Sequence, residues 1–147
     1  MAKKNSINNY IDSIGNFFSV FPDLSKGATQ PIISIIPWLA LIFGTLGIAA
    51  AVVGLGIFTI IEPIAQVTGV KRTGFDFIFV LLSLVSSALL LSAFAKTQRK
   101  EKKGWQLLYY SESAALLSDV LSKDIVGILL SLLVFYILYQ IRSYYTK

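Results

Sequence analysis

Cysteine and histidine are both absent from the 147 residues of this chain. Without cysteine there is no disulfide and no thiol chemistry, and without histidine there is no Ser–His catalytic pair. Together the two absences exclude metal sites built on imidazole or thiolate ligands. No carboxylate-rich metal motif and no nucleophile–base motif replaces them, so we expect no metal, no cofactor and no enzymatic activity.

Charge is scarce as well. Charged residues make up 14% of the chain and hydrophobic residues 55%, whereas a typical soluble domain has about 25% charged residues. So few charges could hardly cover a surface in water. The 13 Lys and Arg outnumber the 8 Asp and Glu, but they lie beside apolar runs, where they indicate membrane topology rather than nucleic-acid binding. We therefore expect a protein embedded in a lipid bilayer, with no nucleic-acid partner.

Four segments are long enough to cross a bilayer as helices. They predict an all-α integral membrane bundle with transmembrane helices at about 32–61, 75–95, 105–121 and 125–141. The first run exceeds one crossing, offers a kink at Pro37 and is expected to end at Glu62-Pro63. The third is the most polar, but only residues 122–124 separate it from the fourth, so the two form an antiparallel hairpin. The alternative is three crossings, with 105–121 lying in the interface.

An amphipathic segment precedes the first crossing. Apolar residues recur every three or four positions over 7–21, which predicts a helix in the interface or one packed on the protein's own membrane domain. Polar residues such as Asn8 and Asp12 argue against a cleavable signal peptide. Residues 22–30 are typical of a linker. The expected division is 1–30, amphipathic helix and linker, and 31–147, the four-helix transmembrane domain.

Basic residues orient the predicted bundle. With four crossings, ten Lys and Arg fall on the side of the two termini and three on the other. The positive-inside rule then places both termini in the cytoplasm, as in a bacterial inner (cytoplasmic) membrane. Half of the ten lie in one loop, at Lys96, Arg99, Lys100, Lys102 and Lys103. They act as a topology determinant or as contacts for anionic lipid headgroups.

A stripe of small residues follows one face of the first helix. It consists of Ala40, Gly44, Gly47, Ala51 and Gly54. Such a seam lets another helix approach closely within lipid. It serves packing inside the chain, an interface between copies of the chain, or a small-molecule groove.

One face of the third helix is small, polar and acidic, with Ser111, Glu112, Ser118 and Asp119 in a single arc. Glu112 lies near the middle of this helix, where an ionised group costs about 2.5–3.5 kcal/mol. A protonated, paired or water-facing carboxyl group avoids that cost. The stripe is thus a candidate intramembrane site for a proton or a cation, or Glu112 hydrogen-bonds a hydroxyl group of a neighbouring helix. Asp119 is expected nearer the far interface.

Four helices with a lone membrane glutamate resemble the small multidrug-resistance transporters. That family carries its glutamate on the first helix and not on the third, so no residue role carries over. The leading hypothesis is a non-enzymatic accessory or scaffold subunit, or a homo-oligomer, that acts through helix packing. The alternative is a small transporter or channel that uses Glu112.

Overall fold

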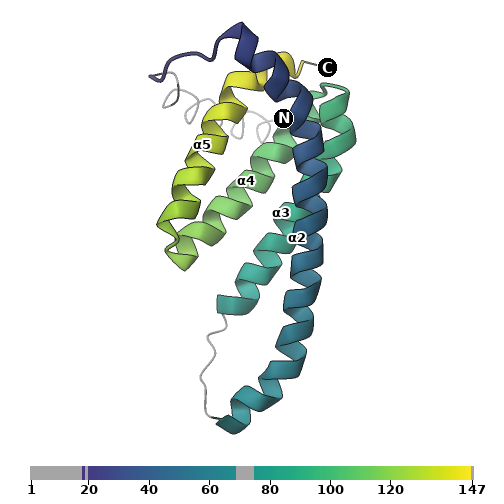
Figure 1. Ribbon diagram of the computed structural model, residues 1–147, viewed down its shortest axis with the longest axis vertical. Coiled ribbons are helices and arrows are strands. Elements are labelled where there is room, and N and C mark those ends of the chain that lie inside the picture. The colour runs from purple at the N-terminus through teal and green to yellow at the C-terminus, as the bar shows by residue number, and fades with distance from the viewer. Residues whose placement is uncertain (1–17, 19, 69–74, 147) are drawn as a thin grey trace, which may run out of the picture.

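The computed structural model describes residues 18, 20–68 and 75–146; for Lys26 and for residues 57–68 and 75–77 the backbone alone is described. Within these ranges the chain is helical and contains no strand, which confirms the predicted all-α class. The elements are α2 (Lys26–Thr68), α3 (Phe75–Gln98), α4 (Lys102–Ser122), α5 (Ile125–Ile141) and a short 3₁₀ turn, η1 (Arg142–Tyr144) (Figure 1).

Helix α2 is longer at both ends than the predicted 32–61. Ser25 caps its start, because the Ser25 hydroxyl accepts the Ala28 N–H at 3.3 Å and the Ser25 carbonyl accepts the Thr29 N–H at 3.1 Å. Pro31 and Pro37 lie inside the helix, so the boundary expected between residues 30 and 31 falls within α2. At about 1.5 Å per residue, its 43 residues reach roughly 65 Å. That length exceeds a bilayer of about 40–45 Å.

A tight turn joins α3 to α4. Lys100 adopts a left-handed conformation with φ 55°, and the Glu101 N–H donates to the Lys96 carbonyl at 2.9 Å. Gly104 then lets the first turn of α4 cross the end of α3. A Cβ atom at this position would lie 2.6 Å from the Thr97 backbone nitrogen. Glycine is therefore required here by the close approach of two backbones.

The predicted hairpin between the last two helices is present. Lys123 has φ 58° at the end of α4. Asp124 caps α5, since its carboxylate accepts the N–H groups of Val126 and Gly127, both at 3.1 Å. In Figure 1, α4 and α5 run antiparallel from this turn. A hairpin this short keeps α4 alongside α5 with the two helix axes antiparallel.

The helices pack in chain order. Helix α3 lies along both α2 and α4, and α5 packs on α4, whereas α2 and α5 make few contacts. The core gathers at the end of the bundle where the C-terminus lies, around residues such as Ala93, Trp105 and Ile141. There the Trp105 indole N–H donates to the Leu138 carbonyl at 2.7 Å and ties α4 to α5. The result is a bundle that is tight on one side and open between α2 and α5.

Three stretches are long and apolar enough to cross a membrane, namely Gly27–Gly56, Ile78–Gln98 and Ile125–Tyr144. They carry large exposed apolar side chains, such as Phe43 at 58% and Leu129 at 61% exposure, as lipid-facing helices do. These features are those of an integral membrane protein. Helix α4 is not among the three, so the fourth crossing stays a prediction.

Most of the predicted amphipathic helix at 7–21 lies outside the described residues. Its end is described at Phe18 and Phe21. Phe18 is buried, and its ring centroid lies 6.4 Å from those of Tyr136 and Tyr139 on α5. The Tyr136 hydroxyl donates to the Pro22 carbonyl at 2.6 Å. This part of the segment is therefore packed against the protein's own α5.

Candidate functional site

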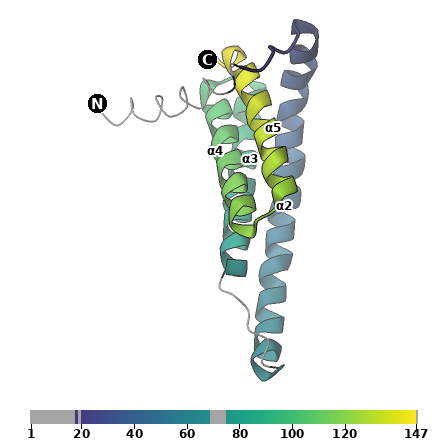
Figure 2. The ribbon, with the colours of Figure 1, turned by 90° about the vertical axis from the view of Figure 1, so that its left-hand side faces the viewer.

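A groove with a volume of about 440 Å³ lies between α2 and α5, with α3 and α4 behind it. Figure 2 shows α5 standing between α4 and α2. We call this cavity the α2–α5 groove. Its lining is almost entirely apolar. It consists of Ile32, Ile35, Ile36, Leu39, Ala40 and Phe43 on α2, Ser86 and Leu90 on α3, Leu108, Ser111, Glu112 and Ala115 on α4, and Val134, Ile137 and Leu138 on α5.

Glu112 is the one charged residue among the described residues that line the groove. It is half-buried in the middle of α4, as the predicted stripe requires. None of the basic side chains in the described ranges forms an ion pair with it. The Ser131 hydroxyl on α5 is a neighbour of this carboxyl group but donates its proton to Asp119. The arrangement offers a carboxyl group with spare oxygen lone pairs to whatever enters an apolar groove.

Ser111 also lines the groove, but its hydroxyl is engaged by Ser86 of α3. Its hydroxyl lies 2.9 Å from the Ser86 hydroxyl and donates to the Ser86 carbonyl at 2.9 Å. The Ser86 hydroxyl donates in turn to the Ser111 carbonyl at 3.1 Å. Ser111 is 2% exposed. The pair therefore joins α3 to α4, and each hydroxyl group already has an acceptor on the partner serine.

Asp119 faces α5 near the hairpin. The Ser131 hydroxyl donates to the Asp119 carboxylate at 3.1 Å, and a Cβ atom at Gly127 would lie 2.7 Å from that carboxyl carbon. The Asp119 side chain thus packs against Gly127 of α5. Ser118 is half-buried and does not line the groove. The structure brings Ser111 and Glu112 to the groove and leaves Ser118 and Asp119 outside it.

The seam of small residues on α2 faces α3. Ala40 and Ala51 are buried. Cβ atoms at Gly44 and Gly54 would meet Leu91 at 2.9 Å and Val80 at 3.6 Å, and one at Gly47 would clash with Ser87. Within one chain, the seam is therefore occupied by α3, and only Ala40 also reaches the groove.

The basic loop lies at the same end of the bundle as the C-terminus. Lys96 is half-buried, and the other four basic residues are exposed. Arg99 and Glu101 are 3.9 Å apart at their charged atoms, an exposed pair that contributes little. Lys102 differs from the rest because it lines a second cavity together with Arg142, Trp105 and Tyr139. The sequence does not predict that these residues meet, because Lys102 and Trp105 lie at the start of α4 whereas Tyr139 and Arg142 lie at the end of α5.

No group of three or more acidic, histidine or cysteine side chains that could hold a metal ion occurs in the part of the chain that the structure describes. The sequence does not predict the α2–α5 groove, because its walls come from segments about a hundred residues apart. In comparisons with family models, with curated proteins and with solved structures, nothing matches this chain.

Proposed function

We propose that this chain is a small integral membrane protein that binds a lipophilic cation in the α2–α5 groove and transports it, without catalysing a covalent reaction. The observation that carries the proposal is the position of Glu112. Among the described residues that line this mostly apolar cavity, its carboxyl group is the one ionisable side chain, and no basic side chain in the described ranges forms an ion pair with it.

The energetics favour a cationic ligand. An ionised carboxylate in the middle of a bilayer costs about 2.5–3.5 kcal/mol, and a bound cation offsets that cost by direct attraction. The apolar lining adds little, because a ligand leaving lipid already had apolar neighbours. Selectivity among ligands should therefore depend on the positive charge that the ligand offers to Glu112 and on how well the ligand fits the groove. A volume of about 440 Å³ is within the range of small-molecule sites.

The proposed topology is four crossings with both termini in the cytoplasm, as in a bacterial inner membrane. Support comes from the position of α4, which lies along α3 and α5, two helices that are long and apolar enough to span. Its polar residues then face neighbouring helices or the groove. The excess of ten basic residues against three supports the orientation.

A second candidate is an accessory or scaffold subunit, or a homo-oligomer, that acts through helix packing. The open side of the bundle supports it, because α2 and α5 leave between them a groove that a transmembrane helix of another chain could enter. The apolar outer face of α5, with Val126 66% and Leu133 53% exposed, would extend such an interface. The seam on α2 lends it no support, since α3 already covers that face.

The test compares two ions of the same shape and opposite charge in lipid nanodiscs. Tetraphenylphosphonium should bind the protein and tetraphenylborate should not. Glu112→Gln should weaken phosphonium binding about tenfold or more, which corresponds to about 1.4 kcal/mol. Glu101→Gln is the control for a lost carboxylate, because Glu101 precedes the first turn of α4 and does not line the groove, and it should bind as the wild type does. Equal binding by Glu112→Gln and the wild type would overturn the proposal.

Crosslinking separates the two candidates. A photoreactive amino acid at Phe43, on the wall of the groove, should give adducts with lipid alone if the groove holds a small ligand. A reproducible protein adduct from native membranes would favour the scaffold. The same probe at Leu46 of α2, which is 60% exposed and does not line the groove, controls for random collisions.

A further inference from the structure

A short segment ahead of α2 connects the two walls of the α2–α5 groove. We call Phe18 and residues 20–25 the strap. Figures 1 and 2 both show it running from the end of α5 near the C-terminus to the start of α2. Helices α2 and α5 make few contacts of their own. The strap therefore joins two helices that hardly touch each other.

Two tyrosines anchor the strap on α5. The Tyr136 hydroxyl donates to the Pro22 carbonyl at 2.6 Å. The ring of Phe18, which is 5% exposed, has its centroid 6.4 Å from those of Tyr136 and Tyr139. The Phe21 ring meets Tyr136 edge-on at 5.8 Å. Aromatic pairs at these separations attract each other, so the anchor combines one hydrogen bond with three ring contacts.

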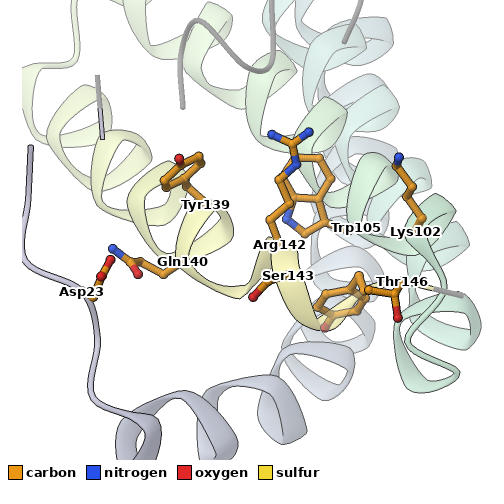
Figure 3. A pocket seen from close by; sticks show the side chains of 9 residues that line it. Asp23, Lys102, Trp105, Tyr139, Gln140, Arg142, Ser143 and Thr146 are labelled. Atoms are coloured by element: carbon orange, nitrogen blue, oxygen red, sulfur yellow. The ribbon is translucent and has the colours of Figure 1, made fainter. Parts of the chain in front are cut away.

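The strap has little slack between this anchor and α2. Figure 3 shows the Asp23 and Gln140 side chains next to each other at the end of α5, where both line the second cavity. Two residues after Asp23, Ser25 caps α2. At no more than about 3.6 Å per residue, the three steps from Pro22 to Ser25 span at most about 11 Å. The start of α2 and the end of α5 therefore stay close to each other as long as the anchor holds.

The anchor lies beside the groove but on the far side of α5. The α2 wall of the groove begins at Ile32, about two turns after Ser25, and the α5 wall ends at Leu138. At 100° per residue, Tyr136 lies roughly 160° around α5 from both Val134 and Leu138, which line the groove. The strap thus holds α5 from the side opposite the groove. Any movement of α5 away from α2 pulls against the strap.

We propose that the strap sets the width of the α2–α5 groove, and that its release from Tyr136 is the step that lets a ligand enter or leave. Apolar helices gain little from contact with each other in lipid. Once the hydrogen bond to Pro22 breaks, little else opposes the separation of α2 and α5. The width of the groove follows from these contacts alone, whereas the exchange of ligand rests on the proposed function.

Two spin labels in lipid nanodiscs measure the width directly. The chain contains no cysteine, so a pair can be introduced at Ile42 of α2 and Leu133 of α5, which are 51% and 53% exposed and do not line the groove. Tyr136→Phe removes the hydrogen bond and keeps the ring. It should enlarge the wide component of the distance distribution about fivefold, as expected for the net loss of one hydrogen bond. Phe18→Ala should enlarge it further, because it removes a buried ring.

Tyr139→Phe is the matched control. Its ring also contacts Phe18, but the hydroxyl that binds the Pro22 carbonyl belongs to Tyr136. Tyr139→Phe should keep the distances of the wild type. A second label pair, at Val53 of α2 and Leu81 of α3, should report unchanged distances in every variant, because α2 and α3 pack closely. Wild-type distances in Tyr136→Phe would overturn the proposal, as would equal widening in Tyr136→Phe and Tyr139→Phe.

Release of radiolabelled tetraphenylphosphonium from the nanodiscs tests the exchange of ligand. A strap that controls access changes the rates of binding and release together, so Tyr136→Phe should raise both about fivefold and leave Kd within about twofold. Glu112→Gln should raise Kd and leave the label distances unchanged. A higher Kd in Tyr136→Phe at unchanged distances would assign Tyr136 to the binding site and overturn the strap. If the wild type fails to bind the phosphonium, the proposed function fails, while the label distances still decide whether the strap sets the width.

Discussion

The two sides of this bundle are built from different residues. On the closed side, which we define as the interfaces of α3 with α2 and with α4, the contacts are made by glycine and serine. Gly44 and Gly47 meet Leu91 and Ser87, and Ser86 meets Ser111. On the open side, between α2 and α5, bulky residues such as Phe43 and Ile137 line a groove. The helices approach each other closely where the facing residues are small, and a groove remains where the facing residues are bulky.

The difference has a physical origin in the surroundings of the helices. In water, exposed apolar side chains would drive α2 and α5 together. Within lipid they gain little by leaving acyl chains for each other, so only close backbone packing and hydrogen bonds bring helices into contact. The open side can therefore persist as a binding groove, whereas the closed side should respond sharply to any added volume.

Gly104→Ala should give the largest effect, on the closed side. The new Cβ atom would lie 2.6 Å from the Thr97 nitrogen and 2.7 Å from the Lys96 carbonyl carbon, and backbone atoms cannot move aside cheaply. Overpacking of this kind should lower the free energy of unfolding by about 3 kcal/mol in mixed micelles. Gly56→Ala is the control, because a Cβ atom there meets nothing within 4 Å. That variant should be as stable as the wild type or slightly more stable. Similar losses in both variants would contradict the close contact.

The serine pair should give a smaller effect on the same side. Ser111→Ala removes the 2.9 Å contact with the half-buried Ser86 hydroxyl and the hydrogen bond to the Ser86 carbonyl, and it should cost about 1 kcal/mol of unfolding free energy. In a double-mutant cycle with Ser86→Ala, the coupling between the two positions should be about 0.6 kcal/mol, as for other hydrogen bonds between membrane helices. Additive losses would mean that the hydroxyl groups do not interact. Ser83→Ala, at an exposed position on α3, should change nothing.

Tyr145→Phe should be neutral or stabilising, in contrast to the serine variants. Tyr145 is 3% exposed, and its hydroxyl has no hydrogen-bond partner in the described part of the chain. Removing such a group should raise the free energy of unfolding by up to about 1 kcal/mol at neutral pH.

The same variant has a pH signature. Burial raises the pKa of Tyr145 to about 12, whereas the unfolded chain has a tyrosine pKa near 10. Between about pH 10 and 12, the unfolded state loses this proton and the folded state keeps it, so the wild type loses stability that Tyr145→Phe retains. Unfolding curves from pH 8 to 12 should show the advantage of the variant growing above pH 10. A constant difference would show that Tyr145 titrates normally.

Much of the closed side was predictable from the sequence. The small residues at spacings of three and four on α2 indicate a packing face, and the short 122–124 connection indicates a hairpin. The bounds of α2 were not predictable, because Pro31 and Pro37 normally favour a helix boundary. Here Ser25 caps the helix upstream of both, and proline is accepted inside membrane helices when neighbouring groups satisfy the carbonyls that it leaves without a donor.

Two features were not predictable from the sequence. One is the groove between α2 and α5, and the other is that the residues of the acidic stripe on α4 face different neighbours. Helical periodicity places Ser111, Glu112 and Asp119 on one face, but a face about 100° wide can meet more than one neighbour. Ser111 meets α3, Asp119 meets α5, and Glu112 falls between them at the groove. Which helices leave a gap depends on how all four pack, and a pattern along one helix does not contain that information.

Ala115→Leu should have the smallest effect on stability, and it tests the open side most directly. Ala115 lies one turn from Glu112 and lines the groove, so a larger side chain enters empty space instead of another helix. The free energy of unfolding should change by no more than about 0.5 kcal/mol, whereas binding of tetraphenylphosphonium should fall about tenfold, because the leucine side chain occupies volume beside the carboxyl group. Ala114→Leu, one residue away and outside the lining, should change neither quantity. If Ala115→Leu destabilises the protein as much as Gly104→Ala does, the open side is packed as tightly as the closed side. The contrast between small and bulky residues would then explain nothing about where this bundle can bind a ligand.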